Sequence, residues 1–183
     1  MMNRTHFAVT VISKDRPGIV ADTAEVLYRL GCNVEDSSCT LLSGDFAMIL
    51  TVSHPKPFTK SRLVDEFRLL HDATGLVAHV RSLGEDELKQ RAPTGELCLI
   101  SVYGADRPGI VYRVTRELAD RRVNITDLNT RLIGTEDDPV YVMMLEAYLP
   151  EGTTIEDAEQ LLAGLRTELK VEIGVRVITP VSL

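Results

Sequence analysis

The hexapeptide Asp-Arg-Pro-Gly-Ile-Val, DRPGIV, occurs at residues 15–20 and again at residues 106–111 of this chain of 183 residues. At the same spacing of 91 residues, identical residues continue beyond the hexapeptide, among them Val11 and Val102, Leu27 and Leu118, Asn33 and Asn124, Asp36 and Asp127. Farther along, the identities continue at a spacing of 95, as in Met48 and Met143, Leu50 and Leu145, Pro55 and Pro150, Leu70 and Leu165. The chain is therefore built from two related halves.

The change of spacing places four extra residues in the second half, within the polar stretch GTEDDP at 134–139. Because insertions collect in turns, this stretch is predicted to be the tip of a hairpin. A second polar run, GEDELKQRAPTG at 84–95, is typical of a linker. We therefore expect a first domain at 1–83, a linker at 84–95 and a second domain at 96–183.

Each half has the same order of hydrophobic patterns. A strand-like run (6–12, 97–103) precedes a helical stripe that in the first half comprises Ile19, Val20, Thr23, Ala24, Leu27 and Leu30. A second strand begins at the Asn, a turn at Ser43-Gly44-Asp45 leads to a third, and a second helix and a closing strand follow. The order β-α-β-β-α-β predicts an α+β fold of two ferredoxin-like domains, each with four antiparallel strands and two helices on one face.

The hexapeptide lies where the first strand of each half leads into the first helix. Asp15 can accept hydrogen bonds from the first-turn N–H groups, Pro17 suits a helix start, and Gly18 lets another group approach the backbone. A helix start alone requires neither Arg16 nor Gly18. Because all six residues are identical in otherwise diverged halves, we expect a shared binding site rather than a helix start alone.

The chemistry of this region suits a free amino acid. A helix N-terminus with unpaired N–H groups attracts a carboxylate. The side-chain amides of Asn33 and Asn124, at the start of each second strand, both donate and accept hydrogen bonds.

With DRPGIV after the first strand and Asn-Val or Asn-Ile before the second, both halves resemble the ACT domain, a small amino-acid-binding regulatory module. The resemblance covers about 5–83 and 96–179. The stretch GCNVEDSSCTLLSGDFAMIL at 31–50 is similar to tandem-ACT glycine cleavage system transcriptional repressors and, more distantly, to the ACT region of formyltetrahydrofolate deformylases.

The resemblance implies a ligand, glycine or a similar amino acid, held between two domains by the first loop of one and the start of strand two of the other. The candidate ligand-binding residues are Asp15, Arg16, Pro17, Gly18, Ile19, Val20, Asn33, Val34, Asp106, Arg107, Pro108, Gly109, Ile110, Val111, Asn124 and Ile125. It also implies regulation of transcription through a protein partner, such as a transcriptional activator. The alternative is an ACT protein that controls a metabolic enzyme allosterically.

The composition of the chain limits the kinds of partner that it can bind. The net charge of −7, from 20 basic and 27 acidic side chains, argues against direct nucleic-acid binding. No apolar run approaches the ~20 residues of a membrane span, and we expect no signal peptide in MMNRTHFAVTVIS. Three cysteines without a CxxC pair indicate a reduced, cytoplasmic setting, with Cys39 and Cys98 expected as small core residues.

No catalytic or metal-binding pattern is found. His6, His54, His71 and His79 lack ligand spacing, and Glu136-Asp137-Asp138 is interpreted as a solvated hairpin tip. In the repeated loop, only Asp15 and Asp106 could react, and both are interpreted as helix caps. We therefore expect no cofactor, no metal and no enzyme activity, although a scaffold without any ligand remains a third possibility.

The first strand is apolar on both faces, with Phe7, Val9 and Val11 on one face and Ala8 and Ile12 on the other. Helices cover only one face of such a sheet. We therefore expect a homodimer, or close packing between domains, to cover the second face.

Overall fold

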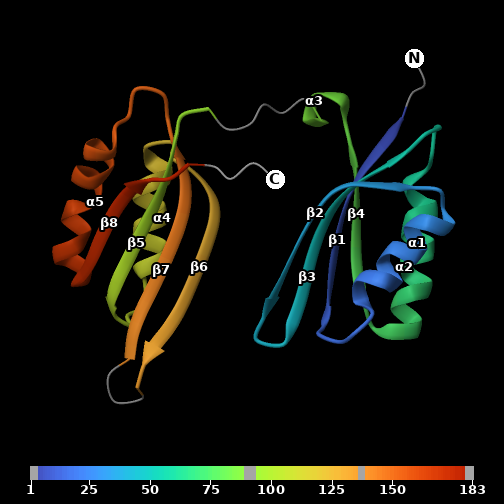
Figure 1. Cartoon of the computed structure of the whole chain (residues 1–183), viewed down its shortest axis with the longest axis horizontal. Helices are drawn as coiled ribbons and strands as arrows, with labels where there is room; N and C mark the ends of the chain where they lie inside the picture. Colours follow the sequence, from blue (N-terminus) through green and yellow to red (C-terminus); the bar gives the residue numbers. More distant parts are fainter. Residues whose placement is uncertain (1–3, 89–93, 136–138, 180–183) are drawn as a thin grey trace. The chain divides into compact units, whose positions relative to one another are not determined.

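The computed structural model of the chain describes residues 4–88, 94–135 and 139–179. The chain divides into two compact units, Met1–Gln90 and Arg91–Leu183, called domain 1 and domain 2 below (Figure 1). The division falls within the stretch 84–95 that the composition predicts as a linker. Part of that stretch, Glu85–Leu88, forms a four-residue helix, α3, which the sequence pattern did not indicate.

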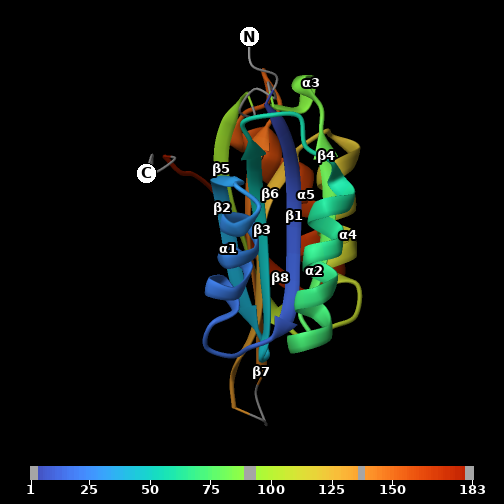
Figure 2. The ribbon, with the colours of Figure 1, turned by 90° about the vertical axis from the view of Figure 1, so that its right-hand side faces the viewer.

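Domain 1 has the predicted order of elements: β1 (Thr5–Lys14), α1 (Ile19–Arg29), β2 (Asn33–Leu42), β3 (Asp45–His54), α2 (Lys60–Thr74) and β4 (Val77–Leu83). The strands form one sheet in the order β2-β3-β1-β4, and each neighbouring pair is antiparallel. Both helices lie on the same side of this sheet (Figures 1 and 2). The ferredoxin-like prediction is confirmed.

Domain 2 repeats this arrangement with β5 (Glu96–Ala105), α4 (Ile110–Asp120), β6 (Asn124–Gly134), β7 (Pro139–Leu149), α5 (Ile155–Leu169) and β8 (Val171–Val177), in the order β6-β7-β5-β8. The strand register also repeats. Val9 lies opposite Leu50 in domain 1, and Ile100 lies opposite Leu145 in domain 2, which reproduces the spacings of 91 and 95 residues. Residues at these spacings are therefore structural counterparts.

The four extra residues of domain 2 lie in the connection between β6 and β7. Gly134 ends β6 and pairs with Pro139, the first residue of β7, so the connection is a hairpin, as predicted. Glu136, Asp137 and Asp138 lie outside the described residues.

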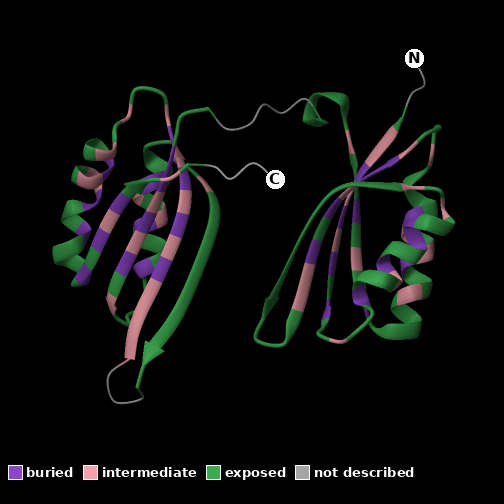
Figure 3. Cartoon of the chain, in the orientation of Figure 1, coloured by how far each residue is buried: buried purple, intermediate pink, exposed green. Residues whose placement is uncertain are grey.

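The helix-facing side of each sheet forms a hydrophobic core. Phe7, Val9 and Val11 of β1 are buried there, together with Ile19 and Leu27 of α1. The equivalent core of domain 2 joins β5, β7 and β8 to α4 and α5. Figure 3 shows the buried residues concentrated on the central strands and on the inner sides of the helices.

The predicted core stripe of α1 is partly wrong. Val20 and Ala24 are exposed, and Val26 is buried in their place. The helix begins only at Ile19, and its buried side is centred on Thr23, Val26 and Leu27.

The edge strands β2 and β6 are exposed along almost their whole length (Figure 3). Cys39, expected in the core, lies on β2 and is exposed, because the helices cover the central strands and leave the edge strand open. Cys98, on the central strand β5, is fully buried, as expected.

The other face of the domain 1 sheet carries apolar side chains. Ile12 and Val77 lie opposite each other on β1 and β4, and Ile49 of β3 lies nearby on the same face; all three are more than half exposed. Among the described residues, no helix is long and apolar enough to cross a membrane.

Candidate functional site

Each hexapeptide forms a short loop and then the first residues of a helix. The first DRPG loop is defined here as residues 15–18 and the second as residues 106–109. Gly18 and Gly109 are the N-cap residues of α1 and α4, with φ of +96° and +97° and ψ of −8° and −7°. This left-handed conformation favours glycine, which explains the fourth residue of the motif. The two N-cap glycines therefore share one backbone conformation.

The interpretation of Asp15 and Asp106 as helix caps is wrong. No side chain caps either helix, because the N-cap position falls on a glycine three residues later. In domain 1 the main-chain N–H of Asp15 instead donates to the carbonyl of Gly44 at 2.9 Å, which fastens the loop to the β2–β3 turn. Neither aspartate carboxylate makes a hydrogen bond or ion pair with another described residue.

The proline also stands outside the helix. Pro17 precedes the N-cap instead of occupying the first turn, and its carbonyl accepts a hydrogen bond from Arg16 Nη1 at 3.1 Å. The first main-chain donor to close a helical turn is Asp22, whose N–H reaches the carbonyl of Gly18 at 2.8 Å.

The start of each helix consequently leaves N–H groups available. In α1 these belong to Ile19, Val20 and Ala21, which precede the first intrahelical donor. In α4 the first donor is Arg113, to Gly109 at 2.9 Å, so the equivalent three groups are free of intrahelical acceptors there too. Such a helix end carries a partial positive charge and attracts anions.

In domain 1 these N–H groups adjoin a shallow depression of about 480 Å³. Its lining consists of Asp15, Arg16, Gly18, Ile19, Val20, Ala21, Ala24 and Phe46. The two apolar residues that failed to enter the core, Val20 and Ala24, therefore form part of its wall. Sequence reasoning missed Ala21, Ala24 and Phe46 as site residues. One of these residues differs between the two halves: Ala21 corresponds to Tyr112 in the second half. That difference was the signal in the sequence that could have pointed to this position.

Arg16, which the helix-start argument left unexplained, is held in place. Its Nη2 donates to Asp22 Oδ2 at 2.6 Å, so the guanidinium ties the loop to the first turn of α1. Domain 2 has Arg113 at the position of Asp22, and Arg113 pairs with Glu168 of α5 at 2.8 Å. The side chain of Arg107 makes no hydrogen bond or ion pair with the residues that the structure describes.

The asparagines do not lie beside the loop of their own domain. Asn33 lies opposite Ser53, which lies opposite His6 near the start of β1, whereas the first DRPG loop follows Lys14 at the end of β1. At the usual rise of a strand, this separation is roughly 25 Å. A loop and an asparagine from one domain therefore cannot hold the same amino acid.

Asn33 and Asn124 nevertheless have the same setting in both domains. Each opens an edge strand, is exposed, and lacks a side-chain hydrogen bond within the described part of the chain. The strand register shifts just after Val34 and again just after Ile125. This repeated bulge gives both strand starts the same local distortion.

The described residues were also compared with the requirements of a metal site and of a reactive thiol. The described residues contain no group of three or more His, Cys, Asp or Glu side chains that could hold a metal ion. Burial raises the pKa of Cys98 to about 11, and burial also raises the pKa of Cys32, against a smaller opposing effect of Arg62. Neither thiol is therefore poised as a thiolate nucleophile.

Comparison with known proteins identifies the repeated unit. ACT-domain family profiles match residues 5–81 and residues 99–163. The glycine cleavage system transcriptional repressor of Escherichia coli K12 is 24% identical over 180 residues, which cover 97% of this chain and 93% of the repressor.

Two solved structures share the whole two-domain chain. An unknown protein from Galdieria sulphuraria aligns with a TM-score of 0.79 and 27% identity, over 97% of this chain and all of the other. A candidate glycine cleavage system transcriptional repressor aligns with a TM-score of 0.71 and 20% identity, over 97% and 99% of the two chains. This chain therefore belongs to the ACT-domain family, as a tandem-ACT regulatory protein related to the glycine cleavage system transcriptional repressors.

Proposed function

We propose that this protein is a non-enzymatic, cytoplasmic regulator that binds a small amino acid at its DRPG loops and acts through a protein partner. The observation that carries the proposal is the duplicated helix start. Gly18 and Gly109 adopt the same left-handed conformation, and each leads into a helix whose first N–H groups lack intrahelical acceptors. Two helix starts with the same hexapeptide and the same glycine conformation are more than helix initiation requires.

The groups around the first loop match the two charges of an amino acid. The N–H groups of Ile19, Val20 and Ala21 suit the carboxylate, and the unpaired carboxylate of Asp15 suits the ammonium. Both groups line the same depression, whose wall includes the small Ala24. We therefore favour glycine or a similarly small amino acid as the ligand.

An asparagine contact to the same ligand would have to come from a different ACT domain, because each domain separates its own loop and asparagine by most of the sheet. This requirement agrees with the arrangement that the ACT resemblance implies. It also supports assembly, and the exposed Ile12, Ile49 and Val77 on the outer sheet face are suited to contact a second copy of the chain.

A protein partner suits the charge better than DNA does. The chain carries 20 basic against 27 acidic side chains, and non-specific DNA binding depends on neutralising phosphates with Lys and Arg. The related E. coli protein is a transcriptional repressor by name. We infer that regulation of this kind passes through a partner such as a transcriptional activator, and that the isolated chain does not shift promoter DNA at physiological salt.

The direct test is a thermal-shift screen of the full chain against the twenty amino acids, because a ligand that binds only the folded state raises the melting temperature. We expect at least one small amino acid to give a shift. The same ligand is then titrated by calorimetry into Gly18→Leu, Gly109→Leu and the controls Gly18→Ala and Gly109→Ala.

Alanine and leucine impose the same positive-φ strain, about 1 kcal/mol, but only leucine places bulk at the helix start. A Cβ at Gly109 meets nothing within 4 Å, and one at Gly18 meets only the end of Arg16. Loss of binding in the leucine variants with retention in the alanine variants supports the site. Equal binding by all four variants and the wild type contradicts it.

A further inference from the structure

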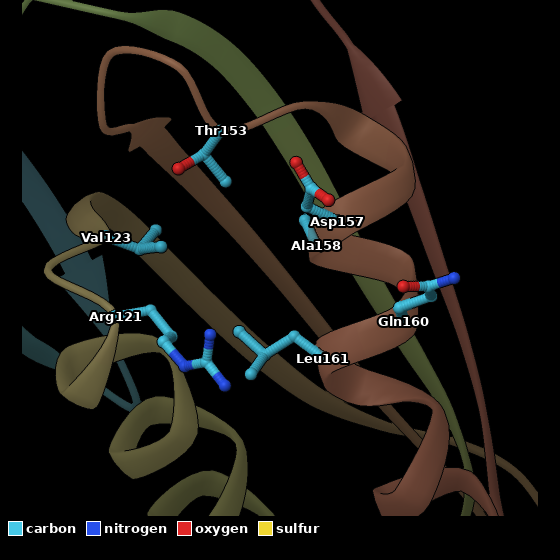
Figure 4. A pocket seen from close by; sticks show the side chains of 7 residues that line it. All are labelled: Arg121, Val123, Thr153, Asp157, Ala158, Gln160 and Leu161. Carbon is cyan, nitrogen blue, oxygen red and sulfur yellow. The ribbon is translucent and has the colours of Figure 1, made fainter.

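A second concave site lies in domain 2, between the end of α4 and the start of α5. The pocket has a volume of about 480 Å³ and is lined by Arg121 and Val123 on one side and by Thr153, Asp157, Ala158, Gln160 and Leu161 on the other (Figure 4). Its volume is within the range of small-molecule sites. Arg121 follows the last residue of α4, whereas the second DRPG loop precedes the first, so the pocket and the loop lie at opposite ends of that helix.

The pocket combines an apolar floor with a polar rim. Val123 and Ala158 are buried, and Leu161 is half-buried. The rim side chains of Arg121, Thr153 and Gln160 make no hydrogen bond or ion pair with any residue that the structure describes. Their polar groups are therefore available to a ligand.

Asp157 is less available to a ligand than the other polar residues of the pocket. Its Oδ2 accepts hydrogen bonds from the main-chain N–H of Thr154 at 2.9 Å and from Thr154 Oγ1 at 3.1 Å, which holds it in the N-terminal capping box of α5. The negative charge of Asp157 disfavours a ligand with two anionic groups. Arg121 is thus left as the one charged group of the lining that can pair with a single carboxylate.

In domain 1, larger side chains stand at the positions that correspond to the pocket of domain 2. The counterparts of Thr153 and Ala158, 95 residues earlier, are Phe58 and Leu63. Leu63 is fully buried, and the Phe58 ring packs edge-on against Phe7 with 6.3 Å between centroids. The Arg62 guanidinium lies 4.9 Å from the centre of the Phe58 ring. Domain 1 therefore places an aromatic ring and a cation here from its own sequence.

Domain 2 has smaller residues at each of these positions. Phe58 is replaced by Thr153, Leu63 by Ala158, and the neighbouring Phe7 by Cys98. In domain 2 the cationic side chain lies on the opposite wall of the pocket, since Arg121 occupies the position of Leu30. The pocket of domain 2 is consequently shaped for a group that domain 1 supplies internally.

We propose that this pocket binds a small monocarboxylate that carries an aromatic or branched aliphatic group. The apolar group packs on Val123 and Ala158 beside Thr153, and domain 1 has Phe58 and Leu63 at the positions of Thr153 and Ala158. The carboxylate pairs with Arg121, and Thr153 and Gln160 provide further hydrogen bonds. The site is independent of the DRPG loops and does not rest on the function proposed for them.

The test uses the full chain with two probes, 3-phenylpropanoate and 4-methylpentanoate, followed by ¹H–¹⁵N correlation spectra. We expect saturable shifts at Val123, Ala158 and Leu161 and none at the first or second DRPG loop. Two variants introduce the domain 1 residues, Thr153→Phe to fill the pocket and Arg121→Leu to remove the charge. Arg121→Leu should weaken binding at least about tenfold, the size expected for losing one charged hydrogen bond. Thr153→Phe should also weaken binding, because its ring takes the space of the apolar group of the probe.

Phe58→Thr is the matched control in domain 1, and it should leave probe binding in domain 2 unchanged. Gly109→Leu, which alters the second DRPG loop, should also leave it unchanged. Failure of both probes to bind overturns the proposal, as does equal binding by the wild type, Thr153→Phe and Arg121→Leu. Shifts confined to the DRPG loops would assign the probes to the other site and would equally overturn it.

Discussion

Domain 1 and domain 2 have the same strand order, the same register and the same conformation at the hexapeptide glycine, yet large and small side chains are placed differently beside the two ends of the first helix. At the loop end, domain 1 has Ala21 where domain 2 has Tyr112. Beside the far end, on the second helix, domain 1 has Leu63 and domain 2 has Ala158. The depression of domain 1 lies at the loop end of its first helix, and the pocket of domain 2 lies at the far end of its first helix.

The ion pairs of the first helix also differ between the two domains. In domain 1, Arg16 of the loop pairs with Asp22 of α1, and in domain 2 the counterpart of Asp22 is Arg113, which pairs with Glu168. The α-helices are joined by Arg29–Glu66 in domain 1, near the far end of α1. The two domains therefore retain one fold while the two ends of the first helix make different contacts.

The largest effect is expected at Leu63. Leu63→Ala removes a fully buried side chain and should lower the free energy of unfolding of domain 1 by about 2–5 kcal/mol. The reciprocal change, Ala158→Leu, introduces bulk beside the domain 2 pocket and should cost less than Leu63→Ala. Urea unfolding followed by amide signals of each domain measures both values. A greater loss in Ala158→Leu would mean that the domain 2 pocket has no room for the leucine.

The second helix of each domain offers a test of intermediate size. Thr154 caps α5 through a reciprocal capping box with Asp157, whereas Thr59 makes no side-chain cap bond to α2. Thr154→Ala should therefore destabilise domain 2 by about 1 kcal/mol, and Thr59→Ala should have a smaller effect on domain 1. Equal losses measured by urea unfolding would contradict this difference.

The same capping box should depend on pH. Hydrogen bonds from the main chain and side chain of Thr154 lower the pKa of Asp157 below its ordinary value. Its stabilising contribution is therefore present above the ordinary carboxyl pKa and is lost as the pH falls through the lowered value. Asp157→Asn should be less stable than the wild type at neutral pH, and the gap should narrow in acid. A gap that stays constant across this range would exclude the carboxylate as its source.

The smallest effect is expected at the ion pair of the first loop. Asp22→Arg places the domain 2 residue in domain 1 and removes the partner of Arg16. Both side chains are about one-third exposed, so the loss of stability should be about 0.2–1 kcal/mol and should shrink at high salt. A loss that does not change with salt, measured by thermal unfolding, would point to packing instead of charge.

Much of the fold could be predicted because the repeat gave two independent patterns for one backbone. The register of β1 on β3 recurs in β5 on β7, and the insertion falls in a hairpin, as the change of spacing indicated. Local patterns identified Ile19, Thr23 and Leu27 on the buried side of α1 but could not set its edge, since Val20 and Ala24 are as apolar as core residues. Nor could they show that β2 is an edge strand that leaves Cys39 exposed.

The ligand-binding role of the hexapeptide residues stays a prediction, and the geometry around them could not be predicted. The identical hexapeptides pointed to a special backbone, and Gly18 and Gly109 do adopt the left-handed conformation. The capping interpretation of Asp15 failed because the helix begins three residues later than the motif suggests. The separation of Asn33 from its own loop depends on strand order, which only the folded chain reveals.

Binding of an amino acid at the DRPG loops can be tested residue by residue with an amide-resolved NMR titration of the full chain, using the amino acid that gives the largest thermal shift. We expect saturable shifts at Ile19, Val20 and Ala21 or at their counterparts in α4, together with shifts at Asn33 or Asn124. Binding that shifts other residues while both helix starts stay unchanged would show that the repeated DRPGIV only begins a helix.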